Sequence, residues 1–453
     1  MYFEAVDWIR RGGALPPDAS QELIAALTRT TYCFRGDRLL LEPKAEVKAR
    51  LGYSPDDADA FALTFAQPVA MRERFYDRTM EGWRCAGGRG RGGRSRSMIR
   101  WRVPSGCASA FARPTARARR GPRMSATIDN GTREVPARML PVPDTVSPQM
   151  QAIIGRPMDP HFNIAPTSTA EWKARVEREA LATAAILPAL RKALGVTVDA
   201  TSIAGVKAFH VTPKSTRPGN DNRVLLHLHG GVRVLNPGEA GTREAILMAG
   251  FAGYRVISLD YRMPPDFPFP AALDDAVAVY RELLKTTEAK RVGIFGTSAG
   301  GSLTLTTLLR AKMEGLPMPG AVAPGTPTVD LSKAGDTLFT NAFVDNVIAT
   351  QDGFIRATAL LYANGRDLKD PLLSPIYGDV HGFPPAILTS GTRDLYLSNT
   401  VRMHRKLRAA GVEAVLQLWE GQSHAQYMAD ISAPETREYH DEVARFFDRH
   451  LAQ

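Results

Sequence analysis

The chain has 453 residues, more than one ordinary domain holds, so we expect one large domain with additional segments. Hydrophobic residues make up 44% of it, enough for a sizeable core, and no apolar run approaches the roughly 18 residues that span a bilayer. The first residues lack the basic and then apolar order of a secretory signal, so we expect a cytoplasmic protein without a membrane partner. The three cysteines lie in the first quarter without a CxxC pair, which excludes a disulfide framework or a thiol nucleophile from the remainder.

The net charge of +10 points to nucleic acid, but its location weakens that interpretation. Residues 84–123 contain twelve arginines and neither a lysine nor an acid, so the basic excess belongs to this one segment. Its composition of Arg, Gly, Ser, Ala and Pro, without helical or strand periodicity, is typical of a disordered linker. The segment separates residues 1–83, whose composition is that of folded protein, from ordinary protein sequence that begins near Met124.

From Met124 onward, short apolar runs alternate with helical patterns. This alternation predicts an α/β fold with a mostly parallel central sheet flanked by helices. We expect an N-terminal segment with cap helices at 124–200 and a catalytic domain at 201–453, which a second cap segment interrupts at about 331–362. The expected strands are 223–229, 254–259, 291–295, 320–323, 386–389 and 414–419, and the expected helices are 171–187, 239–251, 273–284, 299–312, 398–410 and 435–451.

The pentapeptide Gly296-Thr297-Ser298-Ala299-Gly300 follows an apolar run and precedes a helical pattern. In this strand, turn and helix context, G-x-S-x-G indicates a nucleophilic serine, with glycines where strand and helix approach closely. Ser298 is therefore the candidate nucleophile, and the helix N-terminus beside it would favour developing negative charge. A glycine-rich turn with an incidental serine is the alternative interpretation.

The turn His229-Gly230-Gly231 ends the strand-like run that precedes the serine by one strand and helix unit. Backbone N–H groups of such a turn can bind a substrate oxygen together with the N–H of the residue after the nucleophile. We therefore predict an oxyanion hole from Gly230, Gly231, Val232 and Ala299. For His229 we expect a supporting role in the turn rather than that of the base.

The base should be a histidine, because imidazole exchanges protons near neutral pH. Of the nine histidines, His424 lies in a loop of small residues at the carboxyl end of a strand, where such sheets bind ligands. The acid should lie between serine and histidine in the chain, and Asp394 follows the strand at 386–389 through a short loop. Asp370 is the alternative acid and His381 the weaker alternative base.

These residues predict catalysis through an acyl-enzyme. His424 would take the proton of Ser298 as the hydroxyl attacks an ester carbonyl, while Asp394 orients the imidazole. Water would then repeat the cycle on the acyl-enzyme. No metal or organic cofactor is required for this chemistry.

A set of short motifs runs through the second half of the chain, at residues 229–231, 260–262, 264–265, 269–275, 296–301, 370–372 and 422–424. By these motifs, residues from about 145 to 451 resemble the bacterial hormone-sensitive-lipase-like esterases (family IV) of the α/β-hydrolase superfamily. The resemblance implies hydrolysis of short-chain acyl esters as small-molecule substrates, an N-terminal helical cap and frequent formation of a homodimer. Threonine at 297 resembles the subgroup with G-T-S-A-G rather than G-D-S-A-G.

One position departs from the family pattern. The family usually reads H-G-G-G or H-G-G-A, and Val232 stands at the last position here. The resemblance assigns the oxyanion N–H groups to Gly231 and Val232. Valine keeps its N–H, but branching at Cβ resists unusual dihedral angles and crowds the oxyanion, so we expect the activity to survive at a reduced level.

Residues 54–65 resemble the end of the nuclease domain of phage large terminase subunits, with Asp59 or Asp56 as a metal-binding acid. One such acid cannot hold a two-metal centre, so we expect residues 1–83 to be a fragment without activity and the natural esterase to begin near Met124. Two alternatives to an active carboxylesterase stay open. One is a nucleic-acid-binding or nuclease-derived fusion protein, although no specific nucleic acid is expected, and the other is a hydrolase-fold module without catalysis.

Overall fold

The computed structural model describes residues 32–35, 38–41, 135 and 137–452. The chain divides into one unit at Met1–Met139 and another at Leu140–Gln453. In the first unit, β1 (Tyr32–Arg35) and β2 (Arg38–Leu41) form an antiparallel pair. The terminase-like residues 54–65 and the arginine-rich segment lie outside the described residues.

The second unit is built on an eight-stranded sheet with the strand order β10-β9-β8-β7-β5-β6-β4-β3. The strands from β5 to β10 run parallel, and each predicted strand has its counterpart among them. The prediction of a mostly parallel sheet is therefore confirmed. The parallel strands are β5 (Val224–Leu228), β6 (Val256–Leu259), β7 (Val292–Thr297), β8 (Ala321–Gly325), β9 (Ala386–Gly391) and β10 (Ala414–Trp419).

An antiparallel hairpin at the edge of this sheet was not among the predicted elements. It consists of β3 (Val196–Ile203) and β4 (Val206–Pro213), and β4 pairs with β6. The two turn residues, Ala204 and Gly205, have φ of 49° and 78°, as a two-residue hairpin of type I′ requires. Exposed and buried residues are interspersed along both strands, so the hairpin lacks the continuous apolar runs by which the buried parallel strands were recognised.

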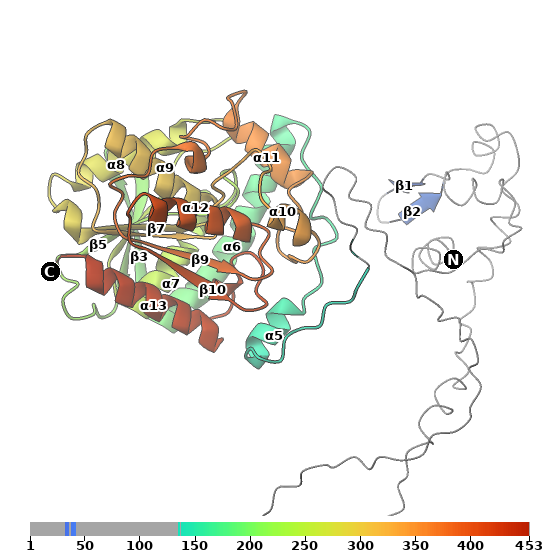
Figure 1. Cartoon of the computed structure of the whole chain (residues 1–453), viewed down its shortest axis with the longest axis horizontal. Helices are drawn as coiled ribbons and strands as arrows, with labels where there is room; N and C mark the ends of the chain where they lie inside the picture. Colours follow the sequence, from blue (N-terminus) through green and yellow to red (C-terminus); the bar gives the residue numbers. More distant parts are fainter. Residues whose placement is uncertain (1–31, 36–37, 42–134, 136, 453) are drawn as a thin grey trace, which may run out of the picture. The chain divides into compact units, whose positions relative to one another are not determined.

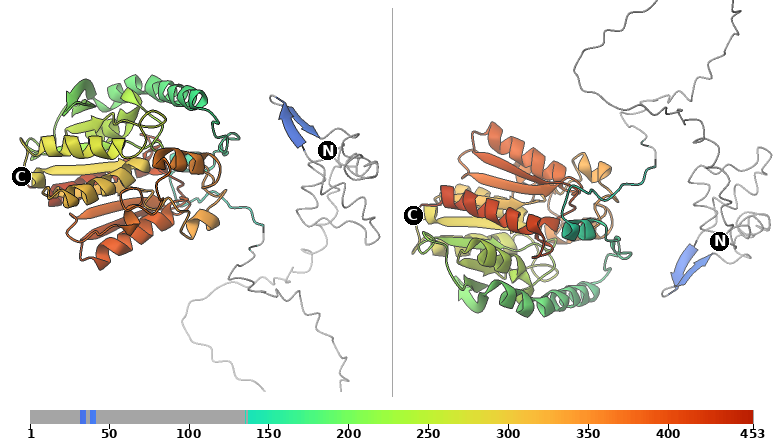
Figure 2. Two further views of the ribbon diagram at one scale, coloured as in Figure 1. Left: turned by 90° about the horizontal axis from the view of Figure 1, so that it is seen from above. Right: turned by 90° about the horizontal axis from the view of Figure 1, so that it is seen from below.

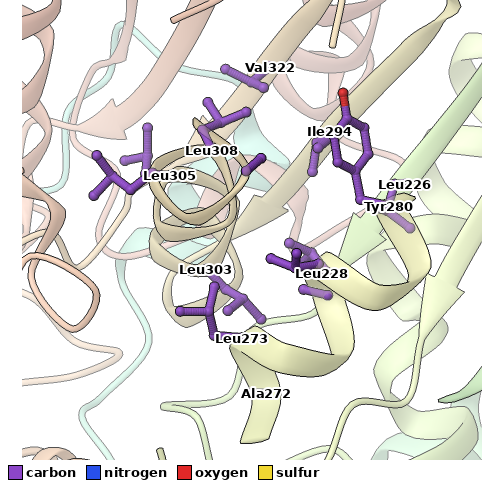
Figure 3. Packing of buried hydrophobic residues seen from close by; sticks show 14 of the residues in the cluster. Leu226, Leu228, Ala272, Leu273, Tyr280, Ile294, Leu303, Leu305, Leu308 and Val322 are labelled. Carbon is purple, nitrogen blue, oxygen red and sulfur yellow. The ribbon is translucent and has the colours of Figure 1, made fainter. Parts of the chain in front are cut away.

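Helices cover both faces of the sheet (Figures 1 and 2). On one face, α8 (Ala271–Leu283) and α9 (Ala299–Met313) pack on the strands. Figure 3 shows Leu273 of α8 and Leu303 of α9 in the same cluster as Leu228 of β5. The opposite face is covered by α7 (Arg243–Ala252), α13 (Pro434–His450) and the C-terminal part of α6 (Thr169–Leu194), where Leu187 is buried. Consecutive residues of β7 point to opposite faces, because Ile294 belongs to the first cluster and Phe295 to the second.

The helices of the sheet layers agree closely with the predicted ranges. Among the described residues, no helix is both long and apolar enough to cross a membrane. The helices of these layers are α7 (Arg243–Ala252), α8 (Ala271–Leu283), α9 (Ala299–Met313), α12 (Leu397–Ala409) and α13 (Pro434–His450), with short 3-10 turns η1 (Gly238–Thr242), η2 (Ala289–Arg291), η3 (Pro375–Tyr377) and η4 (Gln426–Met428).

The two segments that were predicted to form a cap contain α5 (Pro148–Ile154) with α6 (Thr169–Leu194), and α10 (Thr337–Thr340) with α11 (Phe354–Ala363). Ser168 caps α6 by accepting a hydrogen bond from the Glu171 N–H, and the Glu171 carboxylate accepts from Thr167 in return. Trp172 of α6 stacks on Phe354 of α11, with ring centroids 5.8 Å apart. The two cap segments therefore contact one another.

Candidate active site

Ser298 lies at the sharp turn between β7 and α9. Its φ of 62° and ψ of −120° fall in a region that L-residues rarely occupy, at a cost of about 1–3 kcal/mol. The flanking glycines are required by space, since a Cβ atom on Gly296 or Gly300 would lie 2.0 Å or 1.9 Å from the Leu228 carbonyl oxygen. The Ser298 N–H donates to the Gly325 carbonyl at 2.8 Å, which ties the turn to β8.

His424 and Asp394 form a buried pair at the carboxyl ends of β10 and β9. His424 Nδ1 lies 3.1 Å from Asp394 Oδ1. The other carboxylate oxygen accepts hydrogen bonds from the hydroxyls of Ser390 and Thr326, and the Tyr396 N–H donates to Oδ1. The Tyr396 ring also packs edge-on against the imidazole at 5.4 Å. Both members of the pair are thus fixed from several sides.

The charges of the pair stabilise one another. Burial alone would raise the pKa of the Asp394 carboxyl, but the charge of His424 and the surrounding hydrogen bonds hold that pKa below its ordinary value. Burial alone would lower the pKa of His424, yet the charge and hydrogen bond of Asp394 raise it. The site therefore favours the imidazolium that proton transfer from a hydroxyl would produce.

Ser298 and His424 both line a cavity of about 470 Å³. Thr183 and Ile186 of the cap helix α6 line it as well, together with Ile348 of the second cap segment. Within the described part of the chain, no hydrogen bond joins the Ser298 hydroxyl to His424, and such bonds are often long before a substrate is bound. Residues of both predicted cap segments thus form part of the wall around the serine.

The turn after β5 approaches the serine closely. A Cβ atom on Gly230 would lie 2.7 Å from the Thr297 carbonyl oxygen, and one on Gly231 would lie 2.5 Å from that of Leu235. Gly231 has φ of 115° and Val232 has φ of 50°. Among residues that the structure describes, the N–H groups of Gly230, Gly231, Val232 and Ala299 have no hydrogen-bond acceptor within the protein.

His229 is buried beside this turn. Its ring stacks on that of Tyr261 with centroids 4.1 Å apart, and its Nδ1 lies 2.8 Å from the Gly230 carbonyl oxygen. The Tyr261 hydroxyl donates to the His229 carbonyl at 2.6 Å. Burial lowers the pKa of His229 to about 4, so the ring is neutral at pH 7. These contacts suit a residue that supports the turn.

Sequence reasoning did not single out Glu244, a buried glutamate of α7. Its Oε1 accepts from the Thr297 hydroxyl at 2.7 Å, and its Oε2 accepts from the Thr297 N–H at 3.1 Å. The same Oε2 lies 3.2 Å from Nε2 of His227, whose Nδ1 lies 2.9 Å from the Ser258 hydroxyl. The signal was available, because a glutamate in a helix that is apolar on nearly every side must find a partner inside the protein.

The alternative acid and base lie in other surroundings. Asp370 accepts from the N–H of Leu372, two residues further on, and thus forms a local turn. His381 is exposed and lies 2.6 Å from the exposed Asp379 carboxylate. The structure brings together Ser298, Asp394 and His424 rather than either alternative.

Known proteins are similar to this chain in sequence and in fold. A sequence family described as alpha/beta hydrolase fold matches residues 225–428. An acetyl-hydrolase of Streptomyces hygroscopicus is 33% identical over 234 residues, which cover 51% of this chain and 78% of that protein. An esterase of Acinetobacter venetianus is 27% identical over 249 residues, which cover 54% of this chain and 79% of the relative.

Solved structures are similar over a larger share of the chain. Esterase E25 is 43% identical with a TM-score of 0.69, and the match covers 72% of this chain and 100% of that one. An esterase from the bacterial hormone-sensitive lipase family is 28% identical with a TM-score of 0.58, over 68% of this chain and 99% of the other. The predicted α/β-hydrolase fold is confirmed. The chain belongs to the hormone-sensitive-lipase-like esterases, which are carboxylic ester hydrolases of this fold.

Proposed function

We propose that the chain hydrolyses short-chain acyl esters through a covalent acyl-enzyme on Ser298. One observation carries the proposal: Ser298 and His424 line the same cavity, and Asp394 Oδ1 lies 3.1 Å from Nδ1 of the His424 imidazole. This arrangement supports the roles of nucleophile, base and orienting acid in acyl transfer.

Each group has a definite role in the proposed reaction. The Nδ1 atom of His424 faces Asp394, so Nε2 is left to take the proton as Ser298 Oγ attacks the ester carbonyl. The N–H groups of Ala299 and of the turn at Gly230, Gly231 and Val232 would stabilise the oxyanion. The imidazolium then protonates the leaving alcohol. Water, activated by the neutral imidazole, attacks the acyl-enzyme and releases the carboxylic acid.

The cavity supports a small acyl group. Its volume is about 470 Å³, and Ile186, Ile348 and Met428 supply apolar side chains to its wall. The relative from Streptomyces hygroscopicus is named an acetyl-hydrolase, which agrees with a short acyl chain. Threonine at 297, held by Glu244, further supports a place in the G-T-S-A-G subgroup.

A series of p-nitrophenyl esters from acetate to palmitate tests the proposal. We expect the highest kcat/KM on acetate or butyrate and a steep decline toward palmitate. Ser298→Ala should lower turnover by at least a thousandfold, because no nucleophile remains. Wild-type turnover by Ser298→Ala would contradict the mechanism, and a maximum at palmitate would contradict the substrate class.

A further inference from the structure

A third carboxylate, Asp345, lies beside the triad residues without belonging to them. It comes from the segment between α10 and α11, and its side chain is 0% exposed. Within the described residues it has no ion pair with a lysine or arginine side chain. A buried carboxylate without a cation needs several hydrogen-bond donors to offset its desolvation.

Four backbone N–H groups supply these donors. Asp345 Oδ1 accepts from Val347 at 2.8 Å and from Ile348 at 3.1 Å. Asp345 Oδ2 accepts from Leu395 at 2.8 Å and from His424 at 3.2 Å. All four partners donate and none accepts, so the ionised carboxylate is the form that this position can satisfy.

The four donors belong to three different parts of the site. Leu395 follows Asp394 directly, the His424 N–H belongs to the base itself, and Ile348 lines the cavity. One side chain therefore joins the acid loop, the base loop and the second cap segment. The next residue, Asn346, extends this junction, because its N–H donates to the Ser423 hydroxyl at 3.2 Å and its Oδ1 accepts from Gln426 at 2.8 Å.

We propose that Asp345 is a positioning residue of the esterase, whose carboxylate fixes the loops of Asp394 and His424 and supplies a second negative charge to the imidazolium. The inference rests on the proposed role of His424 as the base. No motif pointed to this residue, since the function of an isolated aspartate in a cap segment depends on which loops fold against it.

The charges around the imidazole agree with this role. The groups that face His424 are Asp394, Asp345, the Thr326 hydroxyl and the Tyr396 ring. After Asp394, the charge of Asp345 also raises the pKa of His424. Burial, and then the charge of Asp394, raises the pKa of Asp345, whereas the charge of His424 and the N–H groups of Leu395 and Ile348 favour its ionised form. Removing the charge at 345 should therefore lower the pKa of His424.

The sign of the effect on activity follows. The base must be neutral to accept a proton, so activity is lost as the pH falls through the pKa of His424. A lower pKa moves this acid limb to lower pH. An altered loop position without an altered charge would change kcat and leave the acid limb in place.

The test is Asp345→Asn in the full chain, with kcat and KM measured on p-nitrophenyl acetate from pH 5 to 9. We expect kcat to fall at least tenfold and KM to change less than threefold. The midpoint of the acid limb should move down by about half a pH unit or more. Asp330→Asn is the matched control, because Asp330 is equally buried but pairs with Arg402 and Tyr377.

The control variant Asp330→Asn should lower the stability of the protein without moving the acid limb of the pH profile. Wild-type kcat and an unmoved limb in Asp345→Asn would overturn the inference, and so would an equal shift in Asp330→Asn. If Asp345→Asn does not fold, Asp345→Ser is measured in its place, since serine keeps one acceptor. Failure of both to fold would show a purely structural role and overturn the inference too. Ser298→Ala separates these outcomes from failure of the proposed function. Full turnover by Ser298→Ala would show that the proposed function itself is wrong.

Discussion

Val232 has a backbone conformation that a β-branched residue rarely adopts. Its φ of 50° lies in the left-handed region, where L-residues pay about 1–2 kcal/mol relative to the right-handed form. The residue before it, Gly231, has φ of 115° and no room for a Cβ atom. The turn therefore places a strained valine where the family usually has glycine or alanine.

Val232→Gly should raise kcat on p-nitrophenyl acetate by about two- to fivefold, because the oxyanion position loses its crowding Cβ branch while the N–H remains. Relief of strain offsets the roughly 0.4–1 kcal/mol that glycine loses through chain entropy, so Tm should change little. Thermal unfolding and steady-state kinetics measure both quantities. An unchanged or lower kcat at unchanged Tm would count against the crowding.

Glu244 secures the residue before the nucleophile, and its removal should be severe. Glu244→Ala leaves the Thr297 N–H without an acceptor, at about 1–3 kcal/mol for an unsatisfied buried group, and leaves its hydroxyl only the Tyr427 hydroxyl at 3.2 Å as a partner. We expect Tm to fall and kcat to drop at least tenfold. Glu244→Gln keeps one acceptor oxygen and should recover most of both.

The exposed Glu438 of α13 offers the control for that experiment. Glu438→Ala should leave kcat and Tm within the error of the wild type. Equal losses in the Gln and Ala variants at position 244 would show that the charge, rather than the acceptor oxygen, is what the turn requires.

At the residue scale, some site residues can be predicted from local sequence patterns, whereas others are defined only by tertiary contacts. Ser298, Asp394 and His424 were selected because each follows a strand in the proper chain order, and this information is local. Glu244 and Asp345 carry no such pattern. Their partners, Thr297 and Leu395, are distant in sequence and become neighbours only when helix α7 and the second cap segment pack on the sheet.

At the scale of elements, α5 supports the base loop from outside the sheet. Met150, Ile153 and Ile154 are buried in one cluster with Ala433. The Asn346 side chain donates to carbonyl oxygens of residues 153, 154 and 156, and thereby ties α5 to the junction beside His424.

A chain that begins at Pro157 should therefore lose stability and activity together. Three buried apolar side chains contribute about 1.5–3 kcal/mol each, and their loss should lower Tm by about 10 °C or more. Circular dichroism melting and ester turnover are the measurements. Wild-type values for both would show that α5 has no supporting role.

The elements also show what a sequence pattern can and cannot predict. Buried parallel strands were predicted because both of their faces are apolar, and β5 to β10 confirm these ranges. The hairpin of β3 and β4 was missed because it is half exposed at the edge of the sheet. The helix predicted at 171–187 corresponds to α6, but the predicted range is too short, because α6 continues through Pro188 to Leu194.

At the scale of the whole molecule, the esterase unit spans Leu140–Gln453, and esterase E25 is matched over its entire length by 72% of this chain. We propose that residues before Met124 add nothing to catalysis. A chain that begins at Met124 should retain at least half of the wild-type kcat/KM on p-nitrophenyl acetate and the same preference among acyl chains. Loss of all esterase activity in that shortened chain would refute this division.

Helix α6 both lines the cavity and packs against the sheet. Thr183 and Ile186 line the cavity, while the neighbouring Leu187 is buried against the sheet. Random changes along α6 will therefore mix altered substrate choice with lost stability. Ile348 also lines the cavity, but it lies in the loop between α10 and α11 rather than in a helix packed on the sheet. Libraries that aim at a new acyl preference should accordingly begin at Ile348 and leave α6 intact.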